Sequence, residues 1–174
     1  RTAGWTDFDG RIFWAASPTG PAVLPGRYQV RPTVDGASQT RDFEVRMNPR
    51  AAANGVTLVD LQARYDLATK IRDRVSEANE AVVRMRAIKA AVDDRLGKSD
   101  NGELRTLGGV VKDRLSGVES QIYQVRNRSN QDPLNYPIML NNKIAALLNL
   151  VESSETRPTD QSHAVFDVLS GQLA

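Results

Sequence analysis

Two aspartates near the start of the chain, Asp7 and Asp9, have a type and spacing that could do chemistry. They alternate in the sequence Thr-Asp-Phe-Asp-Gly. Alternate carboxylates before a glycine occur in calcium loops, where several oxygens converge on one cation. The other positions of an EF-hand loop are wrong, since Arg11, Phe13 and Trp14 follow. We therefore favour a turn before a strand as the interpretation of this pair.

Three aromatic side chains, Trp5, Trp14 and Tyr28, form the second candidate group. Such rings combine an apolar body with a polar group, which suits a carbohydrate-binding surface. Aromatic residues make up only 6% of the chain, however, so the same rings are needed for packing. We expect these three side chains in a core or at a contact between domains, with sugar binding as the alternative.

Composition excludes chemistry that depends on several histidines or on cysteine. The chain has one histidine, His163, and no cysteine. Within one copy, a His-based triad would have to use His163. The chain can build no thiol nucleophile and no Cys-based or multi-His metal centre. We expect no catalytic residue, no metal and no cofactor in this chain.

Charge and hydropathy argue against two further classes of partner. The 23 Lys and Arg exceed the 21 Asp and Glu by only two, without clustering into a basic patch, so nucleic-acid binding is not expected. No apolar run approaches the roughly 20 residues that span a bilayer, so no membrane span is expected. Because the sequence opens at Arg1 without an initiating Met or a signal peptide, we expect a domain cut from a longer precursor.

The first part of the chain is predicted to be a β-rich module. Strands are expected at residues 11–15, 27–31 and 40–47. Asp35-Gly36 predicts a tight hairpin turn, because glycine tolerates the positive φ that such a turn needs. Pro32 indicates an edge strand or a bulge. So few strands make a poor independent domain, and we expect support from the helices of this chain or from strands upstream.

The rest of the chain has the 3-4 spacing of apolar residues that is typical of packed helices. Helices are expected at residues 57–96 and 104–126, from about 137, and from about 159 to the end. Thr57 and Asp60 form a capping-box pattern at the start of the long first helix. Short connections predict antiparallel neighbours, with the first three helices as the main bundle and the fourth across it. Gly108 and Gly109 lie within the second helix and indicate close helix contact rather than a break.

The predicted fold class is therefore α+β, mainly α. Residues 1–50 are expected to form a small antiparallel β module, a partial Ig-like unit. Residues 51–174 are expected to form an antiparallel three- to four-helix bundle with a long first helix. If part of the heptad-spaced seam of that helix stays exposed, a homodimer through the long helix is expected.

Several short motifs go beyond generic pattern. Residues 25–30 read Pro-Gly-Arg-Tyr-Gln-Val, residues 34–36 read Val-Asp-Gly, and residues 43–50 end in Met-Asn-Pro-Arg. This order resembles the C-terminal region of large exported bacterial proteins with sortilin-like, BNR/Asp-box β-propellers, often classed as glycosyl hydrolases. In that family an Ig-like module and a helical tail follow the propeller, and residues 140–144 and 156–159 look similar to the tail. Asn48 stands where the family usually has Asp.

The resemblance implies an upstream β-propeller as the partner of this chain and an extracytoplasmic, secreted or periplasmic, location. It implies no activity in this piece, because the propeller and its carboxylates lie outside it. Our leading hypothesis is a non-catalytic accessory, structural or protein-interaction domain. The alternatives are a contribution to a glycoside hydrolase site, for which Asp7 and Asp9 are the only carboxylate pair, and carbohydrate binding by the β module.

Overall fold

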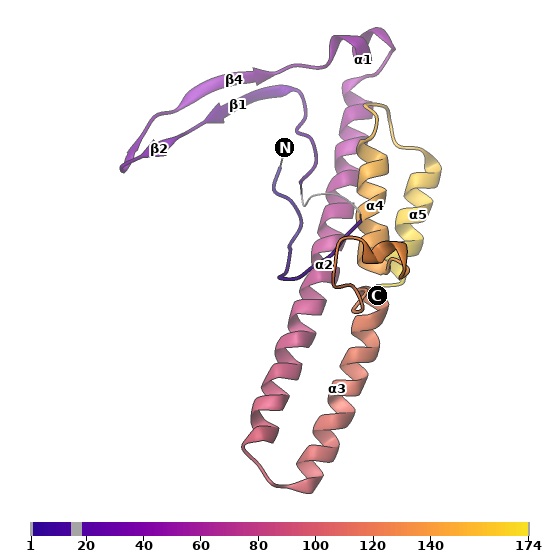
Figure 1. The fold of residues 1–174 in the computed structure, drawn as a ribbon. Coiled ribbons are helices and arrows are strands. Elements are labelled where there is room, and N and C mark those ends of the chain that lie inside the picture. Colours follow the sequence, from indigo (N-terminus) through magenta and orange to yellow (C-terminus); the bar gives the residue numbers. More distant parts are fainter. Residues whose placement is uncertain (1, 15–18, 174) are drawn as a thin grey trace.

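The computed structural model describes residues 2–14 and 19–173 (Figure 1). Its fold is α+β and mainly α, as predicted. The strands are β1 (Gly26–Val30), β2 (Thr33–Val34), β3 (Ala37–Ser38) and β4 (Arg41–Val45). The helices are α1 (Pro49–Ala53), α2 (Leu58–Gly97), α3 (Gly102–Ile122), the 3-10 turn η1 (Asp132–Leu134), α4 (Leu140–Glu152) and α5 (Asp160–Gly171). Among the described helices, none combines the length and the apolar character needed to cross a bilayer.

Helix α2 is the axis of the molecule. It has 40 residues, which corresponds to a length of about 60 Å. The predicted capping box starts it: the Asp60 amide donates to the Thr57 hydroxyl at 3.3 Å, and the Thr57 amide donates to the Asp60 carboxylate at 3.0 Å. The hydrogen bonds from Thr57 hold the pKa of Asp60 below its usual value.

The N-terminal half of α2 packs against α4, and α5 lies on α4 (Figure 1). The α2 seam here alternates at 3-4 spacing, as expected, and α4 supplies the facing side chains. The buried core consists of Trp5, Leu67, Ala68, Ile71, Val75, Leu140, Ile144, Ala145, Leu147, Leu148 and Val151. The seam of the long helix is thus filled from within the chain.

Helix α3 packs antiparallel along the C-terminal half of α2. Gly108 lies at the contact, because a Cβ there would be 2.8 Å from the Leu96 side chain, whereas a Cβ on Gly109 would meet nothing. The prediction of close contact is confirmed for Gly108. Helices α3 and α4 follow one another along α2 and meet each other only where α3 ends, near Ile122.

The segment before β1 is not a strand where one was predicted. Residues 11–14 have no strand partner, and Ala15 lies outside the described residues. The backbone instead meets a side chain of the helical body, since the Ile12 amide donates to the Tyr123 hydroxyl at 3.1 Å. Phe13 packs against both apolar clusters of the body. Ile12 and Phe13 therefore contact the helical body and take no part in a sheet.

Strands β1 and β4 form an antiparallel hairpin that extends away from the helices (Figure 1). The predicted turn is confirmed: Asp35 has φ 50° and Gly36 has φ 81°, the two positive values of a type I′ turn. Pairing is interrupted at Pro32, beyond which β2 and β3 form a separate short ladder. Among the described residues the strands contact one another but no helix.

Candidate interaction surfaces

The first candidate residue, Trp5, belongs to the core of the helical body. It is buried with Leu67 and Ala68, and its ring lies 6.4 Å from that of Phe13. The expectation of a packing role is confirmed for this side chain. The burial of Trp5 also shows that residues before the hairpin pack with the helices. The predicted domain boundary at residue 50 stays a prediction.

The backbone next to Trp5 is held on α2 by polar side chains. The Thr6 amide donates to the Ser76 hydroxyl at 2.9 Å, and the Asn79 side-chain amide donates to the Thr6 carbonyl oxygen at 2.7 Å. Asn79 is fully buried, and its own side-chain oxygen accepts from Asn141 of α4 at 3.0 Å. This chain of hydrogen bonds links the N-terminal segment, α2 and α4.

The two candidate carboxylates do not converge. Asp7 forms a two-point ion pair with Arg11, in which Nη2 lies 3.0 Å from Oδ2. The hydrogen bond from Arg11 is the main reason that the pKa of Asp7 is lowered, despite an opposing effect of partial burial. Asp9 lies in a turn before Gly10, whose φ is 73°. The predicted turn is present, but no strand follows it.

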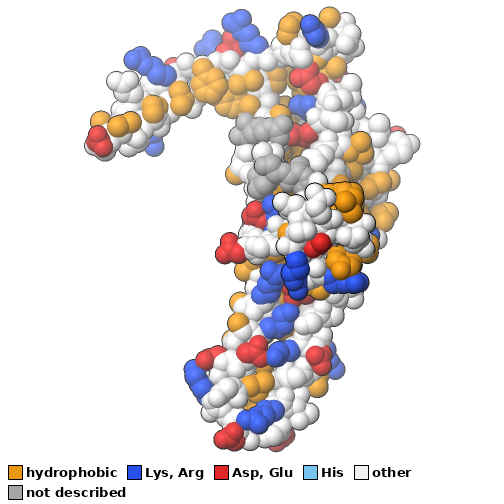
Figure 2. All heavy atoms as spheres, viewed as in Figure 1, with side chains coloured by type: hydrophobic (Ala, Val, Ile, Leu, Met, Phe, Trp, Pro, Cys, Tyr) orange, Lys and Arg blue, Asp and Glu red, His pale blue; other side chains and the backbone are white. Residues whose placement is uncertain are grey.

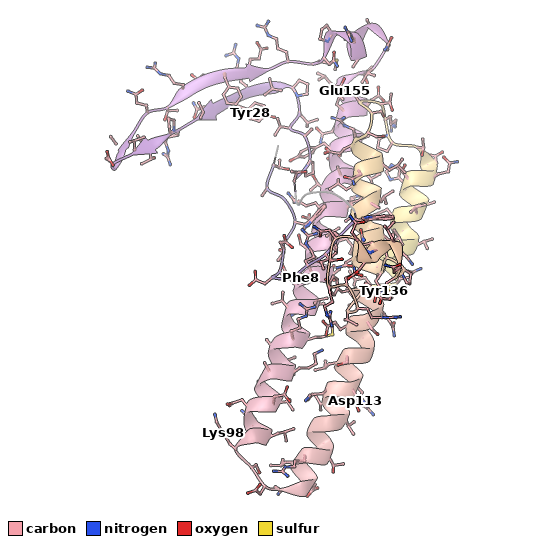
Figure 3. All side chains as sticks on the ribbon, in the orientation of Figure 1. Phe8, Tyr28, Lys98, Asp113, Tyr136 and Glu155 are labelled. Atoms are coloured by element: carbon pink, nitrogen blue, oxygen red, sulfur yellow. The ribbon has the colours of Figure 1, made fainter. Side chains whose placement is uncertain are left out.

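A shallow pocket of about 390 Å³ lies where this turn meets the helices. Its lining comprises Asp9, Gly10, Arg11, Ile12, Arg86, Tyr123, Val125, Asn127 and Arg128. The Tyr123 hydroxyl donates to the Gly10 carbonyl oxygen at 3.2 Å, and the Arg86 guanidinium lies over the rings of Phe8 and Tyr123. Figure 3 shows Phe8 beside α2 at this level. Arg11 and Arg86 each pair with a carboxylate of the chain, and the Arg128 guanidinium donates to the carbonyl oxygens of Val125 and Asn127.

Arg86 and Lys89 of α2 both bind Glu119 of α3. The Glu119 side chain is buried, and Arg86 Nε lies 2.7 Å from its Oε1. Burial alone raises the pKa of Glu119, but the hydrogen bonds and positive charges of Lys89 and Arg86 outweigh it and hold the pKa below its usual value. Lys112 pairs with Asp93 closer to the tip. In Figure 2 these oppositely charged side chains mix along the face of α2 and α3 that the view shows.

The hairpin carries the clearest interaction surface of the described chain. Tyr28 pairs directly with Phe43, and their rings stack with centroids 5.8 Å apart. Directly opposed residues share a face of the ladder, so one face presents the apolar side chains Tyr28, Val30, Phe43 and Val45, together with Gly26 and Arg41. The other face presents the polar side chains Arg27, Gln29, Asp42 and Glu44.

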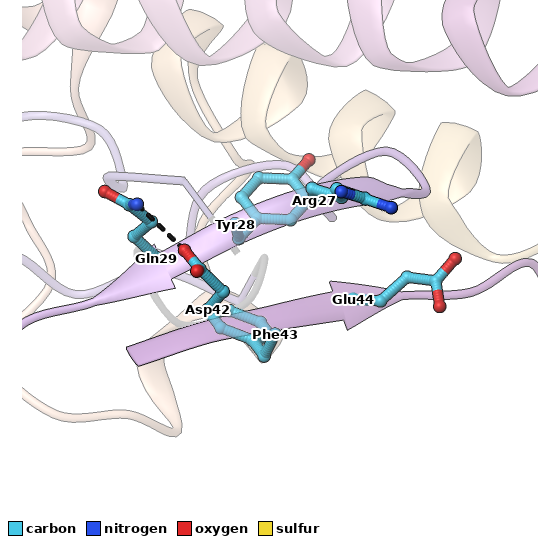
Figure 4. Close-up of a pocket in the computed structure, with 6 residues that line it drawn as sticks. All are labelled: Arg27, Tyr28, Gln29, Asp42, Phe43 and Glu44. Carbon is cyan, nitrogen blue, oxygen red and sulfur yellow. Dashed lines mark hydrogen bonds between the residues drawn. The ribbon is translucent and has the colours of Figure 1, made fainter. Parts of the chain in front are cut away.

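A hollow of about 610 Å³ lies against these two strands (Figure 4). Its lining includes the stacked rings and the hydrogen bond from Gln29 to Asp42, which measures 2.8 Å. Tyr28 is fixed in place because its hydroxyl donates to the Leu24 carbonyl oxygen at 2.7 Å. In Figure 2 apolar side chains line the side of the hairpin that is turned toward the helical body. The stacked rings and the hydrogen bond lie on opposite faces of the ladder, and the two carboxylates of the lining, Asp42 and Glu44, come from the same strand.

The three candidate aromatic residues do not form one sugar-binding surface. Trp5 is buried against Phe13, Tyr28 stacks on Phe43 in the hairpin, and Trp14 is 59% exposed. Within residues 2–14 and 19–173, no group of three or more acidic or histidine side chains is placed to hold a metal ion. The sequence analysis missed Asn79, Glu119 and Tyr123. The sequence did indicate Asn79, because it is a polar residue within the apolar seam of the long helix.

Comparisons with known proteins add no assignment: no family model, no curated protein and no solved structure matches the chain. The function of the chain is therefore inferred from these surfaces and from the sequence motifs.

Proposed function

We propose that this chain is a non-catalytic accessory domain of a larger exported protein, and that the apolar face of its hairpin seats a neighbouring domain of the same polypeptide. The observation that carries the proposal is the uncovered face formed by Tyr28, Val30, Phe43 and Val45. Phe43 is 47% exposed and Val30 is 49% exposed, although both are large apolar side chains on this face.

A ladder of this kind needs a cover to be stable. An isolated two-stranded hairpin is at best marginally stable in water, and antiparallel sheets normally bury one face. The polar face with Arg27 and Glu44 is suited to solvent, whereas the opposite face is suited to packing. Each strand also has one unpaired edge, because β1 and β4 pair only with each other among the described strands. Such edges can accept a further strand.

The resemblance supplies the identity of the cover. The Pro-Gly-Arg-Tyr-Gln-Val motif at residues 25–30 and the start of the motif at residues 43–50 lie on β1 and β4 or directly beside them. In the family that carries these motifs, an upstream β-propeller precedes the module. We take that propeller, or the remaining strands of an Ig-like unit before the hairpin, as the neighbour, and an extracytoplasmic location as the setting.

Amide hydrogen exchange tests the proposal. The hairpin amides are compared in this chain alone and in the longer natural polypeptide that contains it. Protection at β1 and β4 should rise by about 100-fold or more in the longer polypeptide, whereas the buried amides of α4 should change little. Equal exchange of the hairpin in both polypeptides would overturn the proposal.

Matched substitutions on the two faces sharpen this test. Phe43→Ser removes a ring from the apolar face, and Glu44→Ser changes the adjacent residue on the polar face. Phe43→Ser should abolish the added protection in the longer polypeptide, while Glu44→Ser should keep it. Loss of protection with both variants would show general fraying of the hairpin and would count against a seated neighbour.

Catalysis and sugar binding are tested with the same chain. Release of reducing sugars from polysaccharides by this chain alone would refute a non-catalytic role. The Asp7 carboxylate is bound by Arg11 and does not face a second carboxylate across a cleft, so we expect no release. Carbohydrate binding by the β module predicts a change in Trp14 fluorescence on adding glycans, and we expect no change.

A further inference from the structure

A row of apolar side chains on α3 is uncovered although it has regular core spacing. Its members are Leu104, Leu107, Val111, Leu115 and Val118, which we call the α3 stripe. Leu104, Leu107, Val111 and Val118 are between 41% and 55% exposed, whereas Leu115 is half-buried because one side of it packs against the apolar cluster that contains Met85 and Ile122. A helix that faces only solvent on the sides away from α2 would carry polar side chains there, not an apolar row.

The α3 stripe lies on one side of the α2–α3 pair, and the ion pairs lie on the other. At 100° per residue, the mean direction of the stripe around the axis of α3 differs by roughly a quarter turn from that of Lys112 and Glu119. These two side chains reach across to α2. Gly108, whose Cβ would touch α2, lies between the two directions. Ile88 of α2 is 47% exposed and falls on the stripe side by the same geometry. This side therefore combines apolar residues from both helices.

We propose that the α3 stripe is the interface for a second copy of this chain, with the two α3 helices antiparallel about Val111. The intervals along the stripe are 3, 4, 4 and 3 residues, so the pattern reads the same in both directions. A two-fold interface requires that residue i contacts residue j while j contacts i. Antiparallel pairing about Val111 places Leu104 against Val118, Leu107 against Leu115 and Val111 against itself.

The size of the surface fits a weak pair. From Leu104 to Val118 the stripe extends for about 21 Å, at about 1.5 Å per residue. Two adjacent helices, each about 10 Å across, then offer roughly 400 Å² per copy and roughly 800 Å² in total. That area is below the range of stable specific dimers, so the association should be weak and should depend on concentration. The predicted dimer seam of α2 is buried within the chain, and α3 takes its place.

The absence of cysteine allows the geometry to be tested by cross-linking. Val111→Cys should form a disulfide-linked dimer on mild oxidation, because residue 111 faces its own copy. Leu104→Cys alone should not, since antiparallel pairing separates the two copies of residue 104 by about 21 Å, and a disulfide needs Cα atoms within about 7 Å. A mixture of Leu104→Cys and Val118→Cys chains should give the mixed dimer.

Sedimentation of the full chain completes the test. The wild-type chain should shift from monomer to dimer with rising concentration, and Val111→Glu should weaken the association by at least about 10-fold without changing the helical circular dichroism. Val168→Glu is the matched control, because Val168 is a 62% exposed apolar residue of α5 away from the stripe. A monomer at all concentrations, or self-cross-linking of Leu104→Cys as efficient as that of Val111→Cys, would overturn the proposal. Neither result bears on the neighbour of the hairpin.

Discussion

Replacing Asn79 with alanine tests whether a buried polar contact holds the N-terminal segment on the helices. The Asn79 side chain is 0% exposed and makes two hydrogen bonds, to the Thr6 carbonyl oxygen and from the Asn141 amide. Asn141 is 1% exposed, and its side-chain oxygen already has no partner. The substitution would leave the whole Asn141 side-chain amide unpaired inside the core.

The loss of stability follows from these contacts. The bond to Thr6 contributes about 1 kcal/mol, and an orphaned buried amide costs about 1–3 kcal/mol. Alanine regains about 0.5 kcal/mol of helix propensity relative to asparagine. The free energy of unfolding should therefore fall by about 2–3 kcal/mol. Because Thr6 follows Trp5, the environment of the Trp5 ring should change as well.

Urea unfolding followed by tryptophan fluorescence measures both effects. A Trp14→Phe background removes the exposed tryptophan, so that Trp5 alone reports. Asn149→Ala is the matched control on the exposed side of α4 and should change stability by no more than about 0.5 kcal/mol. The double variant Asn79→Ala with Asn141→Ala should cost less than the sum of the two single variants, because no amide is then orphaned. A loss below about 1 kcal/mol for Asn79→Ala, or strict additivity, would refute the reasoning.

Three further predictions concern α2 and α3. The pKa of Glu119 is lowered in the folded protein, so its carboxylate stabilises the fold above its unfolded pKa of about 4.3. This contribution is lost as pH falls through the folded pKa. The midpoint of thermal unfolding should therefore depend less on pH between pH 3 and pH 7 in Glu119→Gln than in the wild-type chain. Gly109→Ala should raise the free energy of unfolding by about 0.5–1 kcal/mol, whereas Gly108→Ala should raise it less because its Cβ approaches Leu96. Urea titrations compare the two variants, and an equal rise in the free energy of unfolding would contradict the contact. Thr57→Ala should cost about 1 kcal/mol by loss of the cap, measured by urea denaturation, and an unchanged midpoint would contradict the role of the cap.

Local rules predicted the parts of the fold that local chemistry determines. The start of α2 follows from the side chains of Thr57 and Asp60, and the tip of the hairpin follows from Asp35 and Gly36. Both depend on residues within one turn of chain, so neighbours far away in sequence cannot change them. The class, α+β and mainly α, followed from the spacing of apolar residues in long segments.

The N-terminal segment shows why the candidate site could not be predicted in the same way. Ile12, Phe13 and Trp14 are consecutive apolar residues, which favours a strand locally, but the segment lies against α2 and α3, where Tyr123 supplies the hydrogen-bond partner. The Tyr123 hydroxyl, 111 residues away in sequence, and the packing of Phe13 on the helices take the place of a neighbouring strand. The position of Trp5 in the core has the same origin, because α4 and α2 must first assemble to enclose it.

The two uncovered apolar surfaces differ in a way that separates their partners. The hairpin face lies on a ladder with no contact to the described helices, and it includes a charged side chain, because Val30 lies opposite Arg41. Its strands also have edges that no described strand pairs, which a strand of another domain can join. The α3 stripe offers no backbone edge, is palindromic about Val111 and carries no charged residue along its centre. Antiparallel pairing of two copies places apolar residues of the stripe against one another at every position. The hairpin therefore suits a neighbouring domain, and the stripe suits a second copy.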